Sequence, residues 1–201
     1  MVKNRGGESP LKAKPMRSRR PSRAAVLIGL IVLASIAGFA ALVLYDRSQQ
    51  APAGVQTFDE SKGVNNHTQG TVKYDHDPPA GGQHNPVWQN QGFYDKPVRN
   101  ENAVHTLEHG GVWITYRPDL PQDQKDRIRD VVQGQDCMLA SPYPDLPENT
   151  PVVASAWGVQ MKFESADNSD LDKFVNYYRK GPQTPEPNAS CTGGTSDTVS
   201  S

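Results

Sequence analysis

The amino-acid sequence predicts an α+β protein: a single N-terminal transmembrane helix followed by a small mixed-sheet domain with two or three helices. Three observations support this fold class. Residues 24–45 form an uncharged apolar run, later short apolar runs lie between turn residues, and three further segments carry helix start and stop signals. The predicted parts are a basic disordered tail (1–23), a transmembrane helix (24–45), a stalk (46–70), a globular domain (71–182) and a C-terminal tail (183–201).

The N-terminal segment is strongly basic, with eight Lys or Arg residues and one Glu in residues 1–23. It has too little apolar surface to offset chain entropy, so it is predicted to be disordered. The following run, AAVLIGLIVLASIAGFAALVLY, is long enough as a helix to span a hydrocarbon core of about 30 Å. A removed signal peptide is the alternative, but its apolar region is usually about 7–15 residues long. An uncleaved anchor is therefore favoured.

The distribution of charge predicts the topology and limits the partners. Basic residues precede the apolar run, which places the N-terminus in the cytoplasm and the C-terminal domain outside the cell membrane, with a single pass. Of the 21 basic and 22 acidic residues, 13 basic and 21 acidic ones follow residue 23. An acidic exterior domain argues against nucleic acid as a partner. The expected partners are the membrane, through residues 24–45, and a protein or envelope component of unknown identity.

Residues 46–70 are polar and rich in turn residues, with one short strand expected at Val55–Phe58. The next stretch, 72–95, contains several Pro and Gly residues and shows neither helical nor strand periodicity. Its large side chains Trp88, Phe93 and Tyr94 must be buried somewhere, which argues against disorder. A long irregular segment of this kind is typical of a functional loop.

Three helices are expected in the domain. The first starts with Asn100 or Asn102 as its cap and ends at a left-handed Gly110. The second starts with Asp119 as its cap, followed by an early proline. The third starts with a capping box of Ser169 and Asp172 and carries one apolar stripe of Leu171, Phe174, Val175 and Tyr178.

Four longer strands are expected between these helices. The predicted strand residues are β-branched, aromatic or otherwise apolar, and turn residues bound each run. The last two strands are expected to pair with each other through Gly158. The four segments are 111–117, 137–141, 151–157 and 159–164.

All five histidines, at positions 67, 76, 84, 105 and 109, lie within 43 residues. His105 and His109 are four residues apart, so a helix presents both on one side, where they can share a metal ion. His76 and His84 lie in the irregular loop, and an ion would supply ordering energy that the loop lacks. The predicted metal ligands are therefore His76, His84, His105 and His109, and imidazole ligands suit zinc or copper. His67, in a polar stretch, is the weakest candidate.

Two other interpretations stay open. The histidines are structural in the first, hydrogen-bonded to backbone carbonyls, and Trp88, Phe93 and Tyr94 line a groove of a non-catalytic module that binds a partner or envelope polymer. In the second, a remote alternative, His105–His109 matches the H-x-x-E-H pattern of a metallohydrolase in which Glu108 activates water. Gly110 and Gly111 end the helix directly after this motif, which disfavours the second interpretation. No catalytic residue is assigned, and enzymatic activity is left undecided.

The chain has two cysteines, Cys137 and Cys191. In an oxidising exterior compartment they would form a disulfide that ties the C-terminal tail to the domain. Two unpaired thiols are the alternative, because sequence alone does not bring the two residues together.

Four segments carry a resemblance to a known family: VKYDHDPPAGGQHNPVWQNQGFYD, PVRNENAVHTLEHGGVWITYRPDLP, MLASPYPDLP and PVVASAWG. Over about residues 55–193 the chain resembles the membrane-anchored bacterial family catalogued as domain of unknown function 3105. The resemblance implies a domain of this family and no particular activity. It also implies recurrent residues at positions that include His76, His84, His105, Glu108 and His109. The family often has cysteine where this chain has Gln91, so the resemblance leaves the Cys137–Cys191 pairing open.

Overall fold

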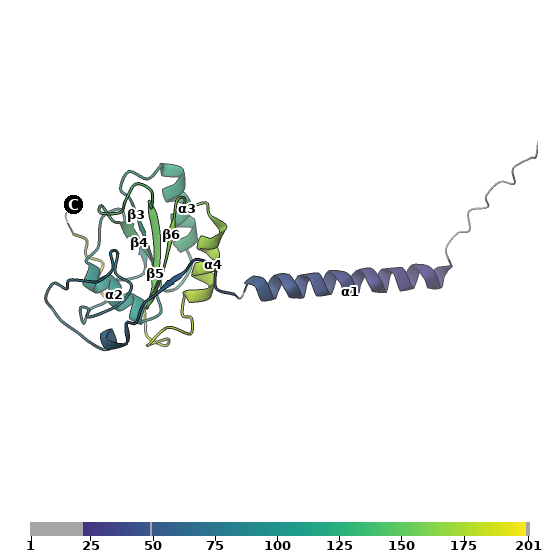
Figure 1. Cartoon of the computed structure of the whole chain (residues 1–201), viewed down its shortest axis with the longest axis horizontal. Coiled ribbons are helices and arrows are strands. Elements are labelled where there is room, and N and C mark those ends of the chain that lie inside the picture. Colours follow the sequence, from purple (N-terminus) through teal and green to yellow (C-terminus); the bar gives the residue numbers. More distant parts are fainter. Residues whose placement is uncertain (1–21, 49, 200–201) are drawn as a thin grey trace, which may run out of the picture. The chain divides into compact units, whose positions relative to one another are not determined.

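The structure is a computed structural model that describes residues 22–48 and 50–199 (Figure 1). Nearly all of the predicted basic tail, 1–23, lies outside the described residues. The chain divides into two compact units, with the boundary between Tyr45 and Asp46.

The first unit contains helix α1, Arg23–Ser48. Its stretch Arg23–Val43 is long and apolar enough to cross a membrane, and it matches the predicted span closely. A signal sequence near an N-terminus can also be apolar enough to meet this criterion, so the helix by itself identifies a candidate span.

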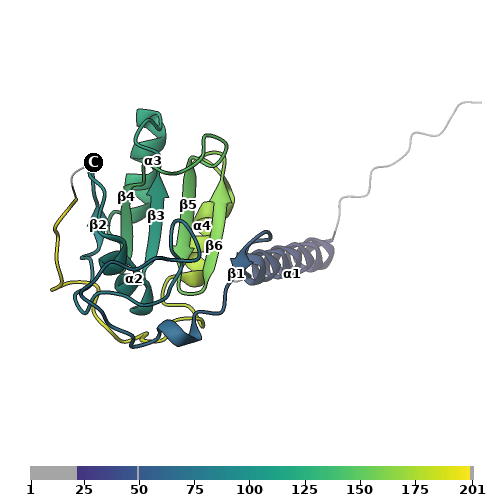
Figure 2. The same ribbon diagram turned by 60° about the vertical axis from the view of Figure 1, so that its left-hand side comes forward.

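The second unit is an α+β domain built on one mixed sheet, as predicted. The strands lie side by side in the order β1-β6-β5-β3-β4-β2 (Figure 2). Strand β3 is parallel to β4 and antiparallel to β5, and β5 and β6 form a hairpin through Gly158. The strands are β1 Gln56–Thr57, β2 Gly92–Phe93, β3 Val112–Tyr116, β4 Met138–Pro142, β5 Val152–Ala156 and β6 Val159–Phe163.

Three α-helices pack on this sheet, α2 on one face and both α3 and α4 on the other (Figure 1). Side chains alternate along β3, so Val112 and Ile114 meet α3 and α4, while Trp113 meets α2. The helices are α2 Asn100–Glu108, α3 Gln122–Val132 and α4 Ser169–Tyr178, and a short 3-10 helix, η1, covers Ser61–Gly63. The apolar stripe predicted for α4 is confirmed, because Leu171, Phe174, Val175 and Tyr178 are all buried.

The predicted helix starts are wrong in detail, although Gly110 ends α2 in the left-handed region as expected, with φ +89°. Helix α4 is capped by Asn168, whose side chain accepts from the Asp170 amide at 2.9 Å. Asp119 does not cap α3, because its carboxylate accepts two hydrogen bonds from Arg117. Neither Asn100 nor Asn102 caps α2: the helix begins at Asn100, and the residue before it, Arg99, makes no side-chain cap bond. The side-chain amide of Asn102 donates to the carbonyl of Val87.

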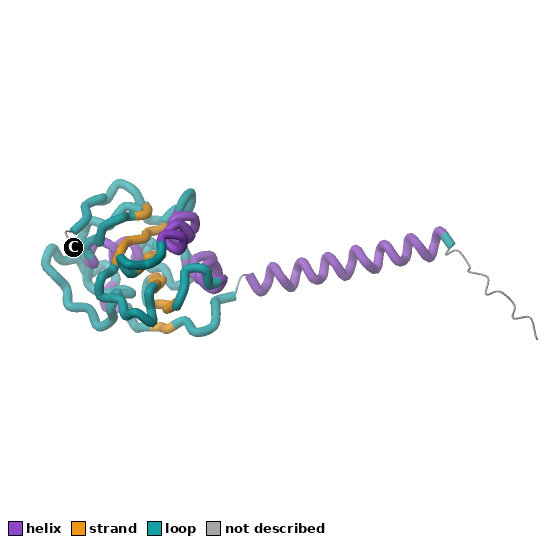
Figure 3. Tube along the Cα trace, turned by 90° about the horizontal axis from the view of Figure 1, so that it is seen from above, coloured by secondary structure: helices purple, strands orange, loops and turns teal. Residues whose placement is uncertain are grey.

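Much of the domain is loop (Figure 3). Between Phe58 and Arg99 the regular elements are η1 and β2. The C-terminal residues run along this loop: the Thr195 amide donates to the carbonyl of Trp88 at 2.9 Å, and the Val199 amide to that of Pro97 at 2.8 Å. Residues predicted as a stalk also belong to this loop, and β1 extends the sheet beside β6.

Cys137 and Cys191 form a disulfide, with their Cα atoms 5.1 Å apart. Gln91, where the resembling family often has cysteine, lies beside this bridge. Its side chain accepts from the Cys137 amide at 2.7 Å, and its own amide donates to the carbonyl of Cys191 at 2.9 Å. The C-terminal residues are thus tied to the start of β4, at a position that Gln91 buttresses.

Candidate metal centre

Helix α2 is buried from its second residue to its last, although six of its nine residues are polar. Ala103, Val104 and Leu107 pack against the sheet. His105 and Glu108 are three residues apart, so they share a side of the helix. This side is covered by loop rather than by sheet, and the two polar groups therefore face a second set of polar side chains.

Two loop segments bring His67 and His84 to that side of α2. The Thr68 amide donates to the carbonyl of His84 at 2.7 Å, and the His84 amide donates to that of Asn66 at 3.0 Å. This pair of bonds forms an isolated parallel bridge that sets His67 beside His84. The Asn85 amide then donates to the carbonyl of Glu101 at 3.1 Å, which docks the loop on α2.

Four side chains meet as a result: His67, His84, His105 and Glu108. One ligand atom from each lies within 4.8 Å of every other. His84 and Glu108 are fully buried, His105 is 5% exposed, and His67 is exposed. We call these four residues the histidine cluster.

Backbone carbonyls orient the two buried rings. Nδ1 of His84 lies 2.8 Å from the carbonyl oxygen of Gly82, and Nδ1 of His105 lies 2.6 Å from that of Asn85. Because a carbonyl oxygen only accepts, each Nδ1 carries the proton. Both rings therefore direct Nε2 toward the cluster. Histidine ligands of metal ions are commonly oriented in this way.

At the centre of the cluster, one carboxylate oxygen lies close to two imidazole nitrogens. Nε2 of His84 lies 2.9 Å from Oε2 of Glu108, and Nε2 of His105 lies 4.0 Å from the same oxygen. Nε2 of His84 and Oε2 of Glu108 are buried atoms without a hydrogen-bond partner among the described residues. Two buried acceptors at this distance repel each other unless a proton or a metal ion lies between them.

The other carboxylate oxygen of Glu108 is already satisfied. Oε1 accepts from the backbone amide of Asn65 at 2.6 Å. Asn65 presents that amide from the left-handed region, with φ +53°, which asparagine tolerates better than most residues. The carboxylate is thereby held with Oε2 directed at the rings.

The surroundings set the protonation states that metal binding requires. Burial is the main cause that lowers the pKa of His105, to about 4, and the neighbouring rings of His109 and His84 add to it. His105 is therefore neutral at neutral pH. Burial works to raise the pKa of Glu108, but the His84 imidazole and the Asn65 amide outweigh it and hold that pKa below its ordinary value. A neutral imidazole and an ionised carboxylate are the forms that bind a cation.

Two of the four predicted ligands, His84 and His105, belong to this cluster, and two lie outside it. The His76 ring stacks on Phe58, with ring centroids 3.6 Å apart. His109 directs Nδ1 at the carbonyl of Ser190, 2.6 Å away, and its Nε2 lies 3.6 Å from Glu186. The other two members of the cluster are His67 and Glu108, which were not among the predicted ligands.

The H-x-x-E-H motif is therefore not arranged as in the hydrolase pattern. That pattern uses both histidines as ligands and the glutamate as a base for water. Here His105 and Glu108 belong to one cluster, whereas His109 has partners in the C-terminal residues. Glu108 lies where a ligand would lie.

Two other acidic residues near the histidines, Glu101 and Asp77, accept hydrogen bonds from groups outside the cluster. Glu101 is buried and accepts from the Val72 amide and from the Arg99 guanidinium. Asp77 accepts from the hydroxyl of Tyr143. The hydrogen bonds of both carboxylates are thus with groups other than an imidazole N–H.

The three loop aromatics occupy separate places. Trp88 contacts the rings of His105 and His109, with centroids 5.7 and 4.9 Å away. The Tyr94 hydroxyl donates to the carbonyl of Asn90, and its ring packs against the core beside α2. Phe93 stacks on Tyr116, on the other face of the sheet, and lies under the guanidinium of Arg129.

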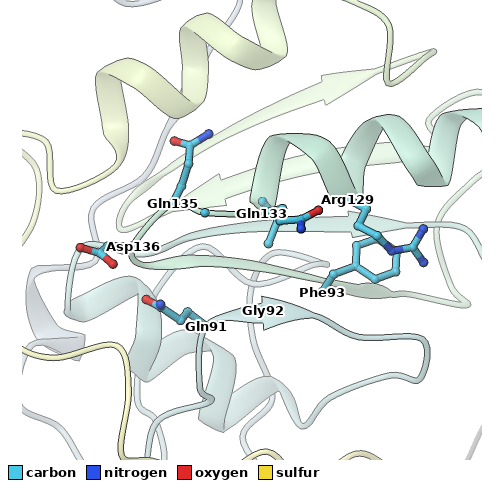
Figure 4. A pocket seen from close by; sticks show the side chains of 9 residues that line it. Gln91, Gly92, Phe93, Arg129, Gln133, Gln135 and Asp136 are labelled. Carbon is cyan, nitrogen blue, oxygen red and sulfur yellow. The ribbon is translucent and has the colours of Figure 1, made fainter.

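Phe93 also lines a cavity of about 530 Å³ between β2 and the end of α3 (Figure 4). The amides of Gln91, Gln133 and Gln135 and the carboxylate of Asp136 form much of its polar lining. No histidine lines this cavity, so it is separate from the histidine cluster.

Comparisons with curated proteins and with solved structures found no match. A family model described as "Protein of unknown function (DUF3105)" matches residues 66–193. The match begins just before His67 and ends just after Cys191, so it contains the whole histidine cluster and the disulfide. Since it covers more than half of the chain, the protein belongs to the DUF3105 family.

Proposed function

We propose that this protein is a membrane-anchored, extracytoplasmic metal-binding protein whose domain holds a transition metal ion in the histidine cluster. The single observation that carries the proposal is the buried pair of His84 Nε2 and Glu108 Oε2, which lie 2.9 Å apart and have no assigned hydrogen-bond partner among the described residues. An ion placed there would turn a repulsive contact into a favourable one. The rings of His67 and His105 supply two further donors.

The donor set favours zinc or copper. Three imidazoles and one carboxylate suit a borderline transition metal, whereas calcium and magnesium prefer oxygen ligands. A divalent ion would also neutralise the Glu108 carboxylate in its buried position. No thiol is available to the cluster, because both cysteines are in the disulfide.

The test is metal content in matched variants. The full-length chain, purified in detergent from cells supplied with zinc or copper, should carry metal by elemental analysis. His84→Ala and His105→Ala should lose it. The controls are His76→Ala and His109→Ala, which remove histidines outside the cluster and should keep it. Metal-free wild-type protein would contradict the proposal and favour structural histidines, with a proton between His84 and Glu108.

The membrane location rests on α1 and on the basic residues before it. Mass spectrometry of the mature protein should detect the intact N-terminus, and protease added to cells with a permeable outer envelope should digest the domain. A mature chain that begins after residue 45 would identify a cleaved signal sequence instead.

A further inference from the structure

The four members of the histidine cluster differ in how firmly they are held. His84, His105 and Glu108 are buried, and each has one atom fixed by a backbone group: the carbonyls of Gly82 and Asn85 and the amide of Asn65. Each of these side chains has two polar atoms. Because a backbone group holds one of them, the other is directed at the centre of the cluster. These three donors form a preorganised set.

His67 is held differently. Its side chain is exposed, and among the hydrogen bonds of the described residues none involves its ring. The ring contacts are with His84, edge-on at 4.9 Å between centroids, and with His105, stacked at 5.0 Å. The adjoining residues Asn65, Asn66 and Gln69 are also exposed. The ring can therefore turn into solvent without opening the core.

Two histidines and one carboxylate are a donor set that leaves positions open on a metal ion. Catalytic zinc sites with His₂Glu ligands keep a fourth position for water or substrate, and the same three donors hold iron with open positions. In the histidine cluster, the one exposed side chain, His67, would take that position.

We propose that His84, His105 and Glu108 hold the ion and that His67 is a displaceable fourth ligand, which opens the ion to a small anionic or neutral nitrogen or oxygen donor from solvent. This inference rests on the proposed function. The exchange is a ligand substitution: the imidazole of His67 leaves with its lone pair, and the incoming donor supplies another. The oxidation state of the metal does not change.

The experiment uses the full-length chain in detergent, loaded with cobalt(II), whose visible spectrum reports the number and type of ligands. His67→Ala should change the spectrum and still bind cobalt, about tenfold more weakly, because water takes the place of an exposed ligand. Glu108→Gln, which keeps the side-chain shape and the bond to Asn65, should bind at least about a hundredfold more weakly, because it removes a buried anionic donor. His76→Ala is the control and should match the wild type.

Titration with azide then tests the open position. Azide should shift the spectrum of the wild type at high concentration and that of His67→Ala at lower concentration, since no ligand must be displaced in the variant. Loss of cobalt from His67→Ala as complete as from Glu108→Gln would overturn the inference, as would a His67→Ala spectrum identical to that of the wild type. Wild-type protein that binds no cobalt would overturn the proposed function together with the inference.

Discussion

One face of the sheet is covered by α3 and α4, and the other by α2 with the loop 58–99 and the C-terminal residues. The first face is held by apolar burial: its core contains side chains from β3 to β6 and from both helices. The buried carboxylates of the described residues, Glu101 and Glu108, both lie on the other face, in α2. The second face has a smaller apolar cluster beneath α2. Above it lie buried polar groups that include His84, Gln89, Glu101 and Glu108.

The two faces therefore depend on different kinds of interaction. The free energy of burying apolar side chains depends mainly on the area buried, so it tolerates small changes in geometry. Buried polar groups need partners at defined positions, and each missing partner costs free energy. On the loop face, these partners are backbone amides and carbonyls, the disulfide and, by our proposal, an ion. We expect the first face to determine whether the domain folds, and the second to determine whether the cluster is assembled.

Removal of the disulfide should have the largest effect on the loop face. In the double variant Cys137→Ser, Cys191→Ser, the link between residues 54 apart is lost. The chain-entropy model predicts that the free energy of unfolding falls by about 4 kcal/mol. Urea unfolding followed by tryptophan fluorescence measures this change.

The same variant should weaken metal binding, because the C-terminal residues contact both Trp88 and the end of α2. The Glu186 amide donates to the carbonyl of Glu108 at 3.0 Å. A variant with unchanged stability and unchanged metal affinity would show that the C-terminal residues hold their place without the bridge.

Truncation of Leu171 should show that the two faces of the sheet act independently. This side chain is fully buried beneath α4, away from the histidine cluster. Leu171→Ala should lower the free energy of unfolding by about 3 kcal/mol, through lost burial and a residual cavity. Metal affinity, measured by titration under conditions where the variant is folded, should not change. A matching loss of affinity would mean that the two faces are coupled more tightly than their contacts indicate.

The contrast also explains what could be predicted from the sequence. Strands β3 to β6 follow from runs of strand-favouring or apolar residues between turns, and helix α4 follows from its apolar stripe, because each element buries these side chains in the core. Strand β2 was not predicted. It has two residues, one of them Gly92, and pairs with β4, which lies more than 40 residues further on. Such a strand exists only because its partner is already in place.

The histidine cluster was predicted only in part, because contacts between distant parts of the chain place some of its members. The clustering of histidines in the sequence correctly indicates His84 and His105 as members. The His109 ring, however, contacts the backbone carbonyl of Ser190, 81 residues away. The sequence ranks His67 as the weakest candidate, because it lies in a polar stretch. Its place comes from a backbone bridge to His84. Glu108 carried a usable signal, since it lies three residues after His105 on the same side of a helix.

Addition of metal should stabilise the loop face by a moderate amount. Zinc at 100 times its dissociation constant should raise the free energy of unfolding of the wild type by about 2.7 kcal/mol, if it binds the folded state alone. Glu108→Gln should gain almost nothing, because its side chain carries no negative charge. Urea unfolding with zinc and with a chelator measures both differences.

Without metal, Glu108→Gln should be at least as stable as the wild type. The amide nitrogen of the new side chain can donate to Nε2 of His84, while its oxygen still accepts from Asn65. The contact between two acceptors is thereby replaced by a hydrogen bond, an exchange worth about 1 kcal/mol. A variant that is clearly less stable than the metal-free wild type would indicate that a proton already bridges His84 and Glu108.

The smallest effect concerns the start of α4, on the apolar face. Asn168→Ala removes the side chain that accepts from the Asp170 amide, and it should lower the free energy of unfolding by about 1 kcal/mol. Ser169→Ala is the matched control: Ser169 is the neighbouring exposed residue, and the sequence pattern predicted it as the cap. This control should change stability by less than about 0.5 kcal/mol, as expected for a surface substitution away from such a cap. Neither variant should alter metal affinity, because α4 and the histidine cluster lie on opposite faces of the sheet. If Ser169→Ala proves the more damaging, the capping box is used after all, and the helix begins one residue later than the structure has it.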